Sequence, residues 1–259
     1  MGQSKDRILT PSVQVVNASG ASSIVLVCEH ASALIPDEFA GLGLSAGDQI
    51  SHAAWDPGAL AVAARLSERL DAVLIAGTVS RLVYDLNRAP GVPGAMPAQS
   101  EVIAVPGNAN LSADARADRA ARYYTPFHKT VADVMAQADA PILVTIHSFT
   151  PVYHGTPRQV EIGVLHGTDS RLADAMLQCA GAHTQADVQR NAPYGPEDGV
   201  LHTLEQHGLR HNHLNVMLEV RNDLVTTPQA QTDMADMIAA WLADACAGLT
   251  VAGGVSCVA

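Results

Sequence analysis

The chain has 259 residues and a formal net charge of −11, with 48% hydrophobic and 16% charged residues. These numbers fit one large α/β domain with a substantial core. The acidic balance argues against nucleic acid and anionic membranes as partners, although a small anionic substrate can still bind through local arginines. No apolar run approaches the ~18 residues of a membrane span. The cysteines are scattered without a CxxC pair, which favours a reducing environment and a cytoplasmic protein: Cys28, Cys179, Cys246 and Cys257.

Residues 1–21 are polar, and we expect them to form an irregular lead-in to a first strand over Ile24–Cys28. The loop that follows contains Gly43-Leu44-Ser45-Ala46-Gly47, which formally matches the GxSxG nucleophile elbow. An elbow needs a strand before it and a helix after it. Because Pro36 and further glycines surround the match, the pattern indicates a turn and not a nucleophile.

The next segments alternate between helix and strand. Asp56-Pro57-Gly58-Ala59 predicts the start of a helix that runs to about Leu70, with the aspartate as N-cap and the proline as first helical residue. A strand is predicted over 72–83, followed by a Pro/Gly-rich loop over 89–110, and loops of that length are usually functional or mobile. A helix over about 112–137 should be interrupted near Pro126.

The second half of the chain predicts a central strand over 141–149, whose short β-branched run is typical of a buried parallel strand. Further strands are expected over 160–165 and from 215, and further helices over 170–180, 198–207 and 228–247. There is no internal repeat and no linker. We therefore predict a single catalytic domain over 22–248, a tail over 249–259, and a three-layer αβα fold around a mainly parallel mixed sheet.

Four predicted strands run into polar, titratable residues at their carboxyl ends, where ligands bind in open α/β sheets. Such a convergence is typical of a hydrolase pocket. Zinc catalysis on an amide needs three protein ligands and an open position for water. His30 and His147 are the best nitrogen ligands, and the third ligand is either Glu29 or Asp56, the latter also being a candidate N-cap. The HxxE spacing is absent, because Ala33 stands where the carboxylate would be.

Several of these segments resemble known metallohydrolases. The stretch 144–149 is similar to the strand with the last zinc histidine of zinc carboxypeptidases, and 217–223 to their strand with the catalytic glutamate. Asp85-Leu86-Asn87-Arg88 resembles the substrate-holding motif of aspartoacylase-type deacylases. From about residue 24 to 225 the chain most resembles the N-formylglutamate amidohydrolase family. The stretches that carry this resemblance are Glu29-His30, Trp55 to Ala59, Ser80-Arg81-Leu82 through Asn87-Arg88, and Glu219 to Leu224.

The resemblance implies a phosphorylase/hydrolase-like fold and a Zn²⁺-dependent deformylase acting on an N-formyl amino acid or a related N-acyl compound, a small molecule with a free carboxylate. Zinc would lower the pKa of a bound water toward ~7. Glu219 would take the proton of that water and pass it to the leaving amine. Arg88 and Arg81 suit the substrate carboxylate, because a guanidinium makes paired bonds to it. Further candidates for substrate binding are Asn87, Arg221 and Tyr194.

Two other functions fit the same residues. One is another metallohydrolase of the superfamily, a deacylase with a different substrate or a carboxypeptidase. The other is a binding protein that has kept the pocket and lost the metal. Cys28 next to the site could be mistaken for a nucleophile, but we expect it to be a small buried hydrophobic residue.

Overall fold

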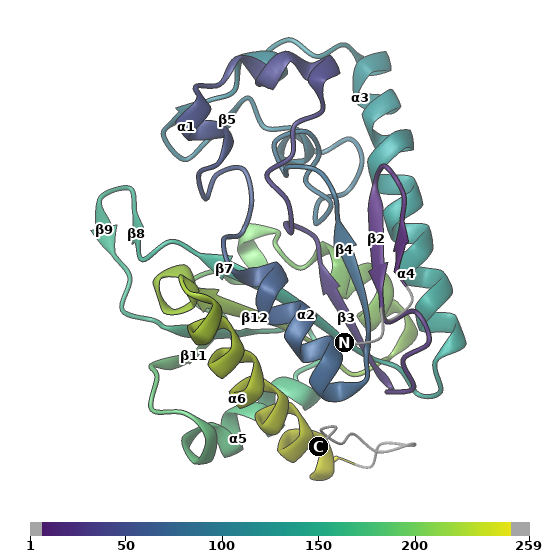
Figure 1. The fold of residues 1–259 in the computed structure, drawn as a ribbon, viewed down its shortest axis with the longest axis vertical. Helices are drawn as coiled ribbons and strands as arrows, with labels where there is room; N and C mark the ends of the chain where they lie inside the picture. Colours follow the sequence, from purple (N-terminus) through teal and green to yellow (C-terminus); the bar gives the residue numbers. More distant parts are fainter. Residues whose placement is uncertain (1–6, 250–259) are drawn as a thin grey trace.

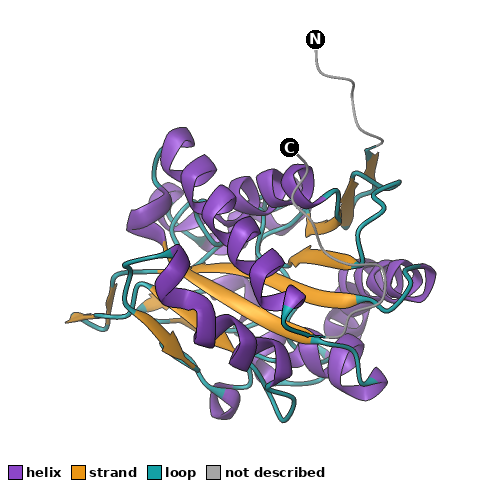
Figure 2. Cartoon of the chain, turned by 90° about the horizontal axis from the view of Figure 1, so that it is seen from below, coloured by secondary structure: helices purple, strands orange, loops and turns teal. Residues whose placement is uncertain are grey.

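The structure is a computed structural model that describes residues 7–249. A central mixed sheet runs through the molecule in the order β1-β2-β4-β3-β7-β12-β10-β11, with helices on both faces (Figures 1 and 2). This confirms the predicted three-layer α/β architecture. The strands of this sheet are β1 (Ile8–Leu9), β2 (Val13–Val16), β3 (Ile24–Cys28), β4 (Val73–Gly77), β7 (Ile142–Phe149), β10 (Ile162–Leu165), β11 (Val188–Arg190) and β12 (Asn215–Arg221). Two small hairpins stand apart from it, β5 (Gln99–Ser100) with β6 (Ile103–Ala104) and β8 (Val152–Tyr153) with β9 (Thr156–Pro157).

The four central strands β4, β3, β7 and β12 are parallel neighbours, so their carboxyl ends meet at one edge of the sheet. Their apolar residues are buried because helices cover both faces, which explains the continuous Val/Ile/Leu runs. On either side of this group, β2 and β10 run antiparallel to their inner neighbours.

One face of the sheet is covered by α2 (Ala59–Leu70), α5 (Arg171–His183) and α6 (Pro228–Ala247), as Figure 1 shows. The helix predicted over 228–247 is α6, and its apolar residues Ile238, Trp241 and Leu242 are fully buried in the core. Trp241 also donates a hydrogen bond from its indole nitrogen to the backbone oxygen of Met176 on α5, over 2.7 Å. The polar tip of the largest core side chain is therefore satisfied where it is buried.

The other face carries α4 (Thr125–Gln137), which continues from α3 (Ala113–Arg119) through a π-helical turn over Ala120–Tyr124. Pro126 has no backbone N–H, and the helix shifts its hydrogen bonds just before it, with the backbone nitrogen of Thr125 bonded to the oxygen of Ala120. The predicted interruption is thus a change of helical pitch and not a break. The short helix α1 (Ala46–Gln49) lies at the opposite end of the molecule from α6 (Figure 1).

Three predicted elements are wrong in extent. Residues 8–16 are not irregular: β1 and β2 extend the sheet, and Val13 and Val15 alternate toward the core. The strand predicted over 72–83 ends at Gly77, because the following backbone bonds to loops, as Ser80 does to Leu34. The helix predicted over 198–207 begins later, since Gly199 lies at a φ of 66°, and the helical turns are Leu204–Gly208 and Leu209–His211.

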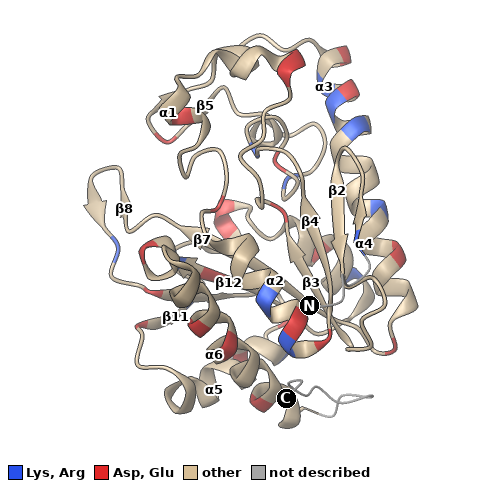
Figure 3. Cartoon of the chain, in the orientation of Figure 1, with Lys and Arg blue, Asp and Glu red and all other residues tan. Residues whose placement is uncertain are grey.

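Other sequence features can also be placed. Ser45 is exposed and caps α1 by accepting a hydrogen bond from the backbone nitrogen of Asp48, so the GxSxG match is a turn, as predicted. Within residues 7–249 no helix is both long and apolar enough to cross a membrane. Most of the predicted tail, residues 250–259, lies outside the described residues. Figure 3 shows basic and acidic residues interspersed along α3.

Two glycines allow the chain to approach the site. Gly58 precedes α2 with a φ of 83°, and a Cβ there would lie 2.6 Å from a methyl carbon of Val225. Gly77 ends β4, where a Cβ would lie 2.2 Å from the backbone oxygen of Glu29. Only glycine fits both positions, because a side chain would push apart segments that carry site residues.

Candidate active site

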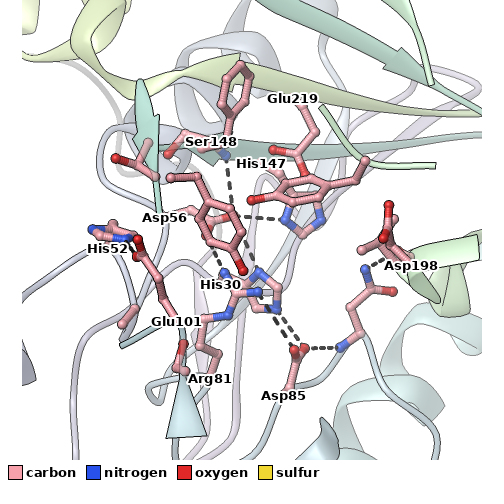
Figure 4. Close-up of a pocket in the computed structure, with 18 of the residues that line it drawn as sticks. His30, His52, Asp56, Arg81, Asp85, Glu101, His147, Ser148, Asp198 and Glu219 are labelled. Carbon is pink, nitrogen blue, oxygen red and sulfur yellow. Dashed lines mark hydrogen bonds and ion pairs between the residues drawn. The ribbon is translucent and has the colours of Figure 1, made fainter. Parts of the chain in front are cut away.

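Polar side chains from three neighbouring strands converge at the carboxyl edge of the parallel strands (Figure 4). His30 lies two residues beyond the end of β3, and His147 lies within β7. In the β7–β12 register His147 is directly opposite Glu219, so the two side chains project from the same face of the sheet. The two imidazole rings have centroids 4.9 Å apart and an interplanar angle of 69°.

Asp56 joins the two histidines from the loop before α2. Its Oδ2 lies 2.8 Å from Nδ1 of His147 and 3.4 Å from Nδ1 of His30. Its other oxygen accepts a hydrogen bond from Arg81 over 3.0 Å. The carboxylate does not cap α2, whose N-cap position is Gly58 and has no side-chain hydrogen bond. Asp56 was a candidate both for the N-cap of this helix and for the third metal ligand, and the structure excludes the N-cap role.

The outer nitrogen of each imidazole faces a buried carboxylate. Nε2 of His30 lies 2.7 Å from Asp85, and Nε2 of His147 lies 3.1 Å from Glu29. A carboxylate in this position fixes the tautomer and orientation of the ring and raises the basicity of the inner nitrogen. In this arrangement Glu29 faces the far side of His147, away from Asp56.

The charges of this cluster shift several pKa values. Burial by itself would raise the pKa of Asp56, but His30, His147 and Arg81 outweigh it and hold that pKa well below its ordinary value. His147 in turn has a pKa well above its ordinary value, because Glu29 and Asp56 overcome the opposing effect of burial. The pKa of Glu29 falls to about 2 despite its burial, chiefly through His147. Three carboxylates around two imidazoles thus create a site that favours positive charge.

Glu219 differs from the other buried acids. Burial raises its pKa above the ordinary value, and the nearby charge of Asp56 adds to this effect, whereas His147 and Arg81 oppose it. The side chain is only 5% exposed, and its Oε2 has no hydrogen-bond partner. Glu219 thus lines the cavity, has one buried oxygen without a hydrogen-bond partner, and has a pKa shifted toward the range in which a carboxyl group can exchange protons.

The cluster opens into a cavity of about 270 Å³. Besides the central residues, its lining includes Arg81, Asn87, Arg88 and Tyr194, all of which the sequence singled out. The amide of Asn87 bonds to the backbone of Val200 and Thr203, and Arg88 donates to the backbone oxygen of Gly199.

Arg221 does not line this cavity. Its guanidinium is paired with Glu161 at 3.2 Å and with Asp223 at 2.8 Å. Cys28 is fully buried, and burial, Asp56 and Glu29 raise the pKa of its thiol well above the ordinary value, which agrees with a packing role and not with a nucleophile.

The structure also places at the cavity wall residues that were not among the predicted catalytic, substrate-binding or metal-binding residues. Asp85 orients His30, and its place in the Asp85-Leu86-Asn87-Arg88 stretch was the only signal for it. Glu101 comes from the long loop over 89–110 and accepts hydrogen bonds from Nε2 of His52 and the backbone nitrogen of His154, over 2.8 and 3.0 Å. The long loop over 89–110 thus contributes Ser100 and Glu101 to the cavity wall. The other wall residues are Ala53, Ser100, Ser148, Phe149, Thr150, Tyr153, Asp198 and Val200.

The central residues fit a metal ion. His30, Asp56 and His147 each offer one ligand atom, and these atoms lie within 4.8 Å of one another. Nδ1 of His30 is buried and has no hydrogen-bond partner, so this nitrogen is free to bind an ion. Two imidazole nitrogens and one carboxylate oxygen form a common catalytic zinc set. Another such group in the described chain, Cys179 with His183 and Asp244, is partly exposed between α5 and α6, away from this cavity.

Behind the site lies a cluster of buried histidines, His128, His202 and His207. Nδ1 of His128 bonds to Nε2 of His207 over 2.8 Å, and Nε2 of His128 bonds to the backbone oxygen of Leu86. Burial lowers the pKa of His202 to about 4 and that of His207 to about 3, with His128 adding to both shifts. The cluster is therefore neutral at physiological pH and supports the loop that carries Asp85 and Asn87.

This cluster predicts an acid-sensitive fold. Because the pKa values of His202 and His207 are lower in the folded than in the unfolded state, the unfolded chain binds more protons below about pH 6.5. Lowering the pH from about 7 to about 5 should reduce the free energy of unfolding by on the order of 1 kcal/mol per histidine. Urea unfolding at both pH values measures this loss. A His202→Gln, His207→Gln double variant should lose less free energy of unfolding between the two pH values than the parent protein. His154→Gln, at an exposed position, should lose as much as the parent. Equal losses in all three proteins would contradict the prediction.

Comparison with known proteins agrees with this architecture. The family model for N-formylglutamate amidohydrolase matches residues 22–226. No curated protein matches the chain. A solved structure of gene product Atu2144 from Agrobacterium tumefaciens is 50% identical, with a TM-score of 0.90, and the match covers 92% of this chain and 96% of that one.

Two more distant structures are also similar. N-formylglutamate amidohydrolase from Ralstonia eutropha JMP134 shares 16% identity and a TM-score of 0.62, over 93% of this chain and all of that one (100%). Succinylglutamate desuccinylase from Chromobacterium violaceum has 16% identity and a TM-score of 0.42, over 97% of this chain and 68% of that one.

The fold and the cluster define an α/β protein with a buried histidine–carboxylate site at the carboxyl edge of its parallel strands. The chain belongs to the N-formylglutamate amidohydrolase family, a hydrolase family, since the family model matches most of its length.

Proposed function

We propose that this protein is a metal-dependent amidohydrolase that removes the formyl group, or another small acyl group, from the nitrogen of an amino acid. The observation that carries the proposal is the arrangement of His30 and His147 around Asp56, with Glu219 opposite His147 on the next strand. Membership of the family supports the amide chemistry. The cavity of about 270 Å³ supports a small substrate, because it is below the ~300–1,000 Å³ typical of drug-sized ligand sites.

His30, His147 and Asp56 would hold the ion, for which zinc is the best candidate, and Glu29 and Asp85 would orient the two histidines. When bound, such an ion supplies Lewis-acid chemistry, which polarises a carbonyl group and acidifies water. Glu219, whose side chain lines the cavity, would accept a proton from the attacking water at its carboxylate and return it to the leaving nitrogen. Arg81 lines the cavity while it is paired with Asp56, and would add positive charge beside the substrate.

A screen of N-formyl and N-acetyl amino acids with zinc-reconstituted protein tests this proposal, using release of the free amine as the measurement. Turnover of these compounds is the expected result. If the protein instead cleaves blocked dipeptides and leaves N-formyl amino acids intact, it is a carboxypeptidase. Failure to retain a divalent ion after reconstitution would indicate a binding protein without metal.

Arg88 is the residue we propose for the substrate carboxylate. Its side chain is 22% exposed in the cavity wall, close to Asn87. Arg88→Ala should raise KM by ~10–100-fold, because hydrogen bonds to charged groups contribute ~1.5–3 kcal/mol. Arg88→Lys should recover only part of the loss, since it keeps the charge without the paired geometry.

The matched readout is the preference of each protein for a substrate acid over its amide. The wild type should prefer the acid, and the preference should shrink in Arg88→Ala. As a control, Arg171→Ala on α5 removes an exposed guanidinium that lies away from the cavity and should change nothing. An unchanged preference in Arg88→Ala would exclude Arg88 as the carboxylate-binding residue and make Arg81 the next candidate.

A further inference from the structure

Arg158 is held among aromatic side chains at the cavity wall. Its guanidinium carbon lies 4.4 Å from the ring centroid of Tyr153, 4.7 Å from that of Tyr194 and 5.5 Å from that of Phe149. All three of these aromatic residues line the cavity. Among residues 7–249, no carboxylate lies within ion-pair distance of Arg158. The cation is therefore fixed by ring faces and not by a neutralising acid.

The backbone at Arg158 is fixed as well. Its nitrogen donates to the oxygen of Pro151 over 2.8 Å, which closes the base of the β8–β9 hairpin. Its oxygen accepts a hydrogen bond of 3.3 Å from Arg221, at the end of β12. Arg221, which the sequence suggested as a substrate ligand, thus supports Arg158 from behind while it is paired with Glu161.

Arg158 acts on the hydroxyl group of Tyr194. Its Nη1 lies 3.0 Å from that oxygen, and because a guanidinium has only donors, Tyr194 must accept this bond. The proton of the Tyr194 hydroxyl then remains free for another acceptor. Burial and the charge of Glu219 raise the pKa of this phenol, and although Arg158 and Arg81 lower it, the net shift is upward, so the phenol keeps its proton at neutral pH.

We propose that Arg158 is a positioning residue that holds the hydroxyl of Tyr194 as a hydrogen-bond donor into the cavity, directed at the oxygen of the amide that is cleaved. The assignment of that oxygen rests on the proposed amidohydrolase function. Negative charge develops on the oxygen as the amide is attacked, and a donor fixed beforehand stabilises this charge without reorganisation. The aromatic rings keep Arg158 in place, so the donor does not depend on a mobile side chain.

A double-mutant cycle tests the coupling. Tyr194→Phe and Arg158→Met should each lower kcat by about tenfold to a hundredfold with a smaller change in KM. The double variant should be no slower than Tyr194→Phe alone, because both changes remove the same donor. Arg158→Lys should recover part of the rate, since an ammonium group can donate to the phenol but cannot pack as a plane between the rings. Arg190→Met, at an exposed position paired with Asp174, is the matched control.

A second readout does not need turnover. The tyrosinate absorbance that is present in the wild type and missing in Tyr194→Phe reports the phenol of Tyr194 alone. Arg158→Met and Arg158→Lys should both raise the pKa at which this absorbance appears, and the increase should be larger in Arg158→Met. Three results would each overturn the proposal. They are additive losses of kcat in the double-mutant cycle, an effect on KM alone, and a Tyr194 titration that the Arg158 variants leave unchanged. If no N-formyl or N-acyl amino acid is cleaved, the proposed function fails, while the titration still decides whether Arg158 controls Tyr194.

Discussion

Replacing Glu219 with Gln is expected to leave metal binding intact and to lower kcat by ~10²–10⁴-fold, the usual contribution of a general acid–base residue. Gln keeps the size of the side chain and removes its ability to accept and return a proton. The prediction follows from three features of Glu219: its place opposite His147, its free Oε2 and its raised pKa.

The measurement is turnover at saturating substrate together with the metal content of the purified variant. Glu68→Gln is the control, because Glu68 is an exposed carboxylate on α2 that is paired with Arg65 and does not line the cavity. A Glu219→Gln enzyme with near-normal kcat would remove Glu219 from the mechanism. A variant that loses the ion would show that Glu219 is a ligand and not the base.

His147→Ala is expected to abolish stoichiometric metal binding, whereas Glu29→Gln should weaken it by only ~10–100-fold. The difference follows from the geometry of the imidazole: its Nδ1 faces Asp56 at 2.8 Å, and its Nε2 faces Glu29 at 3.1 Å. One nitrogen can bind an ion that Asp56 shares, and the other can only be supported by Glu29. Asp56→Asn should therefore resemble His147→Ala more closely than Glu29→Gln does.

Titration of the metal-free proteins with zinc, followed by calorimetry, gives the dissociation constants. His166→Ala, at a position outside the site where His166 bonds to Arg190, controls for the loss of one imidazole. If Glu29→Gln abolishes binding and Asp56→Asn does not, the two carboxylates exchange roles and Glu29 is the ligand. Retention of stoichiometric zinc by His147→Ala would place the ion elsewhere.

Much of the fold could be predicted because it is encoded locally. The apolar runs of β3, β7 and β12 and the helical pattern of α6 lie within short stretches of consecutive residues, and each corresponds to a real element. The strand over 72–83 was overestimated for the same reason: its residues are buried and apolar, but from Ser80 onward their backbone bonds to loops and not to a neighbouring strand. The hydrophobic pattern of a sequence indicates which residues are buried, but it does not indicate which segments pair through backbone hydrogen bonds.

Side-chain roles that depend on distant partners could not be predicted in this way. Asp56 has the sequence signature of a helix cap, yet its carboxylate lies between two histidines that come from strands far away in the chain. Arg221 is the last residue of β12, at the carboxyl edge of the sheet where a substrate ligand is expected. Its guanidinium instead donates hydrogen bonds to Glu161 and to the backbone oxygen of Arg158. Local sequence cannot show which of several partners is nearest once the chain has folded.

The sequence by itself determined the class of fold, the central strands and most of the flanking helices, and the titratable residues that end the parallel strands, because hydrophobic pattern and strand polarity are local properties. Only the tertiary structure decided that Asp56 faces both histidines, that Asp85 and Glu29 support them, and that Arg158 holds Tyr194. These assignments depend on distances of a few ångströms between residues separated by tens of positions in the chain. They are set by the register of β7 on β12 and by the packing of the loops above the sheet.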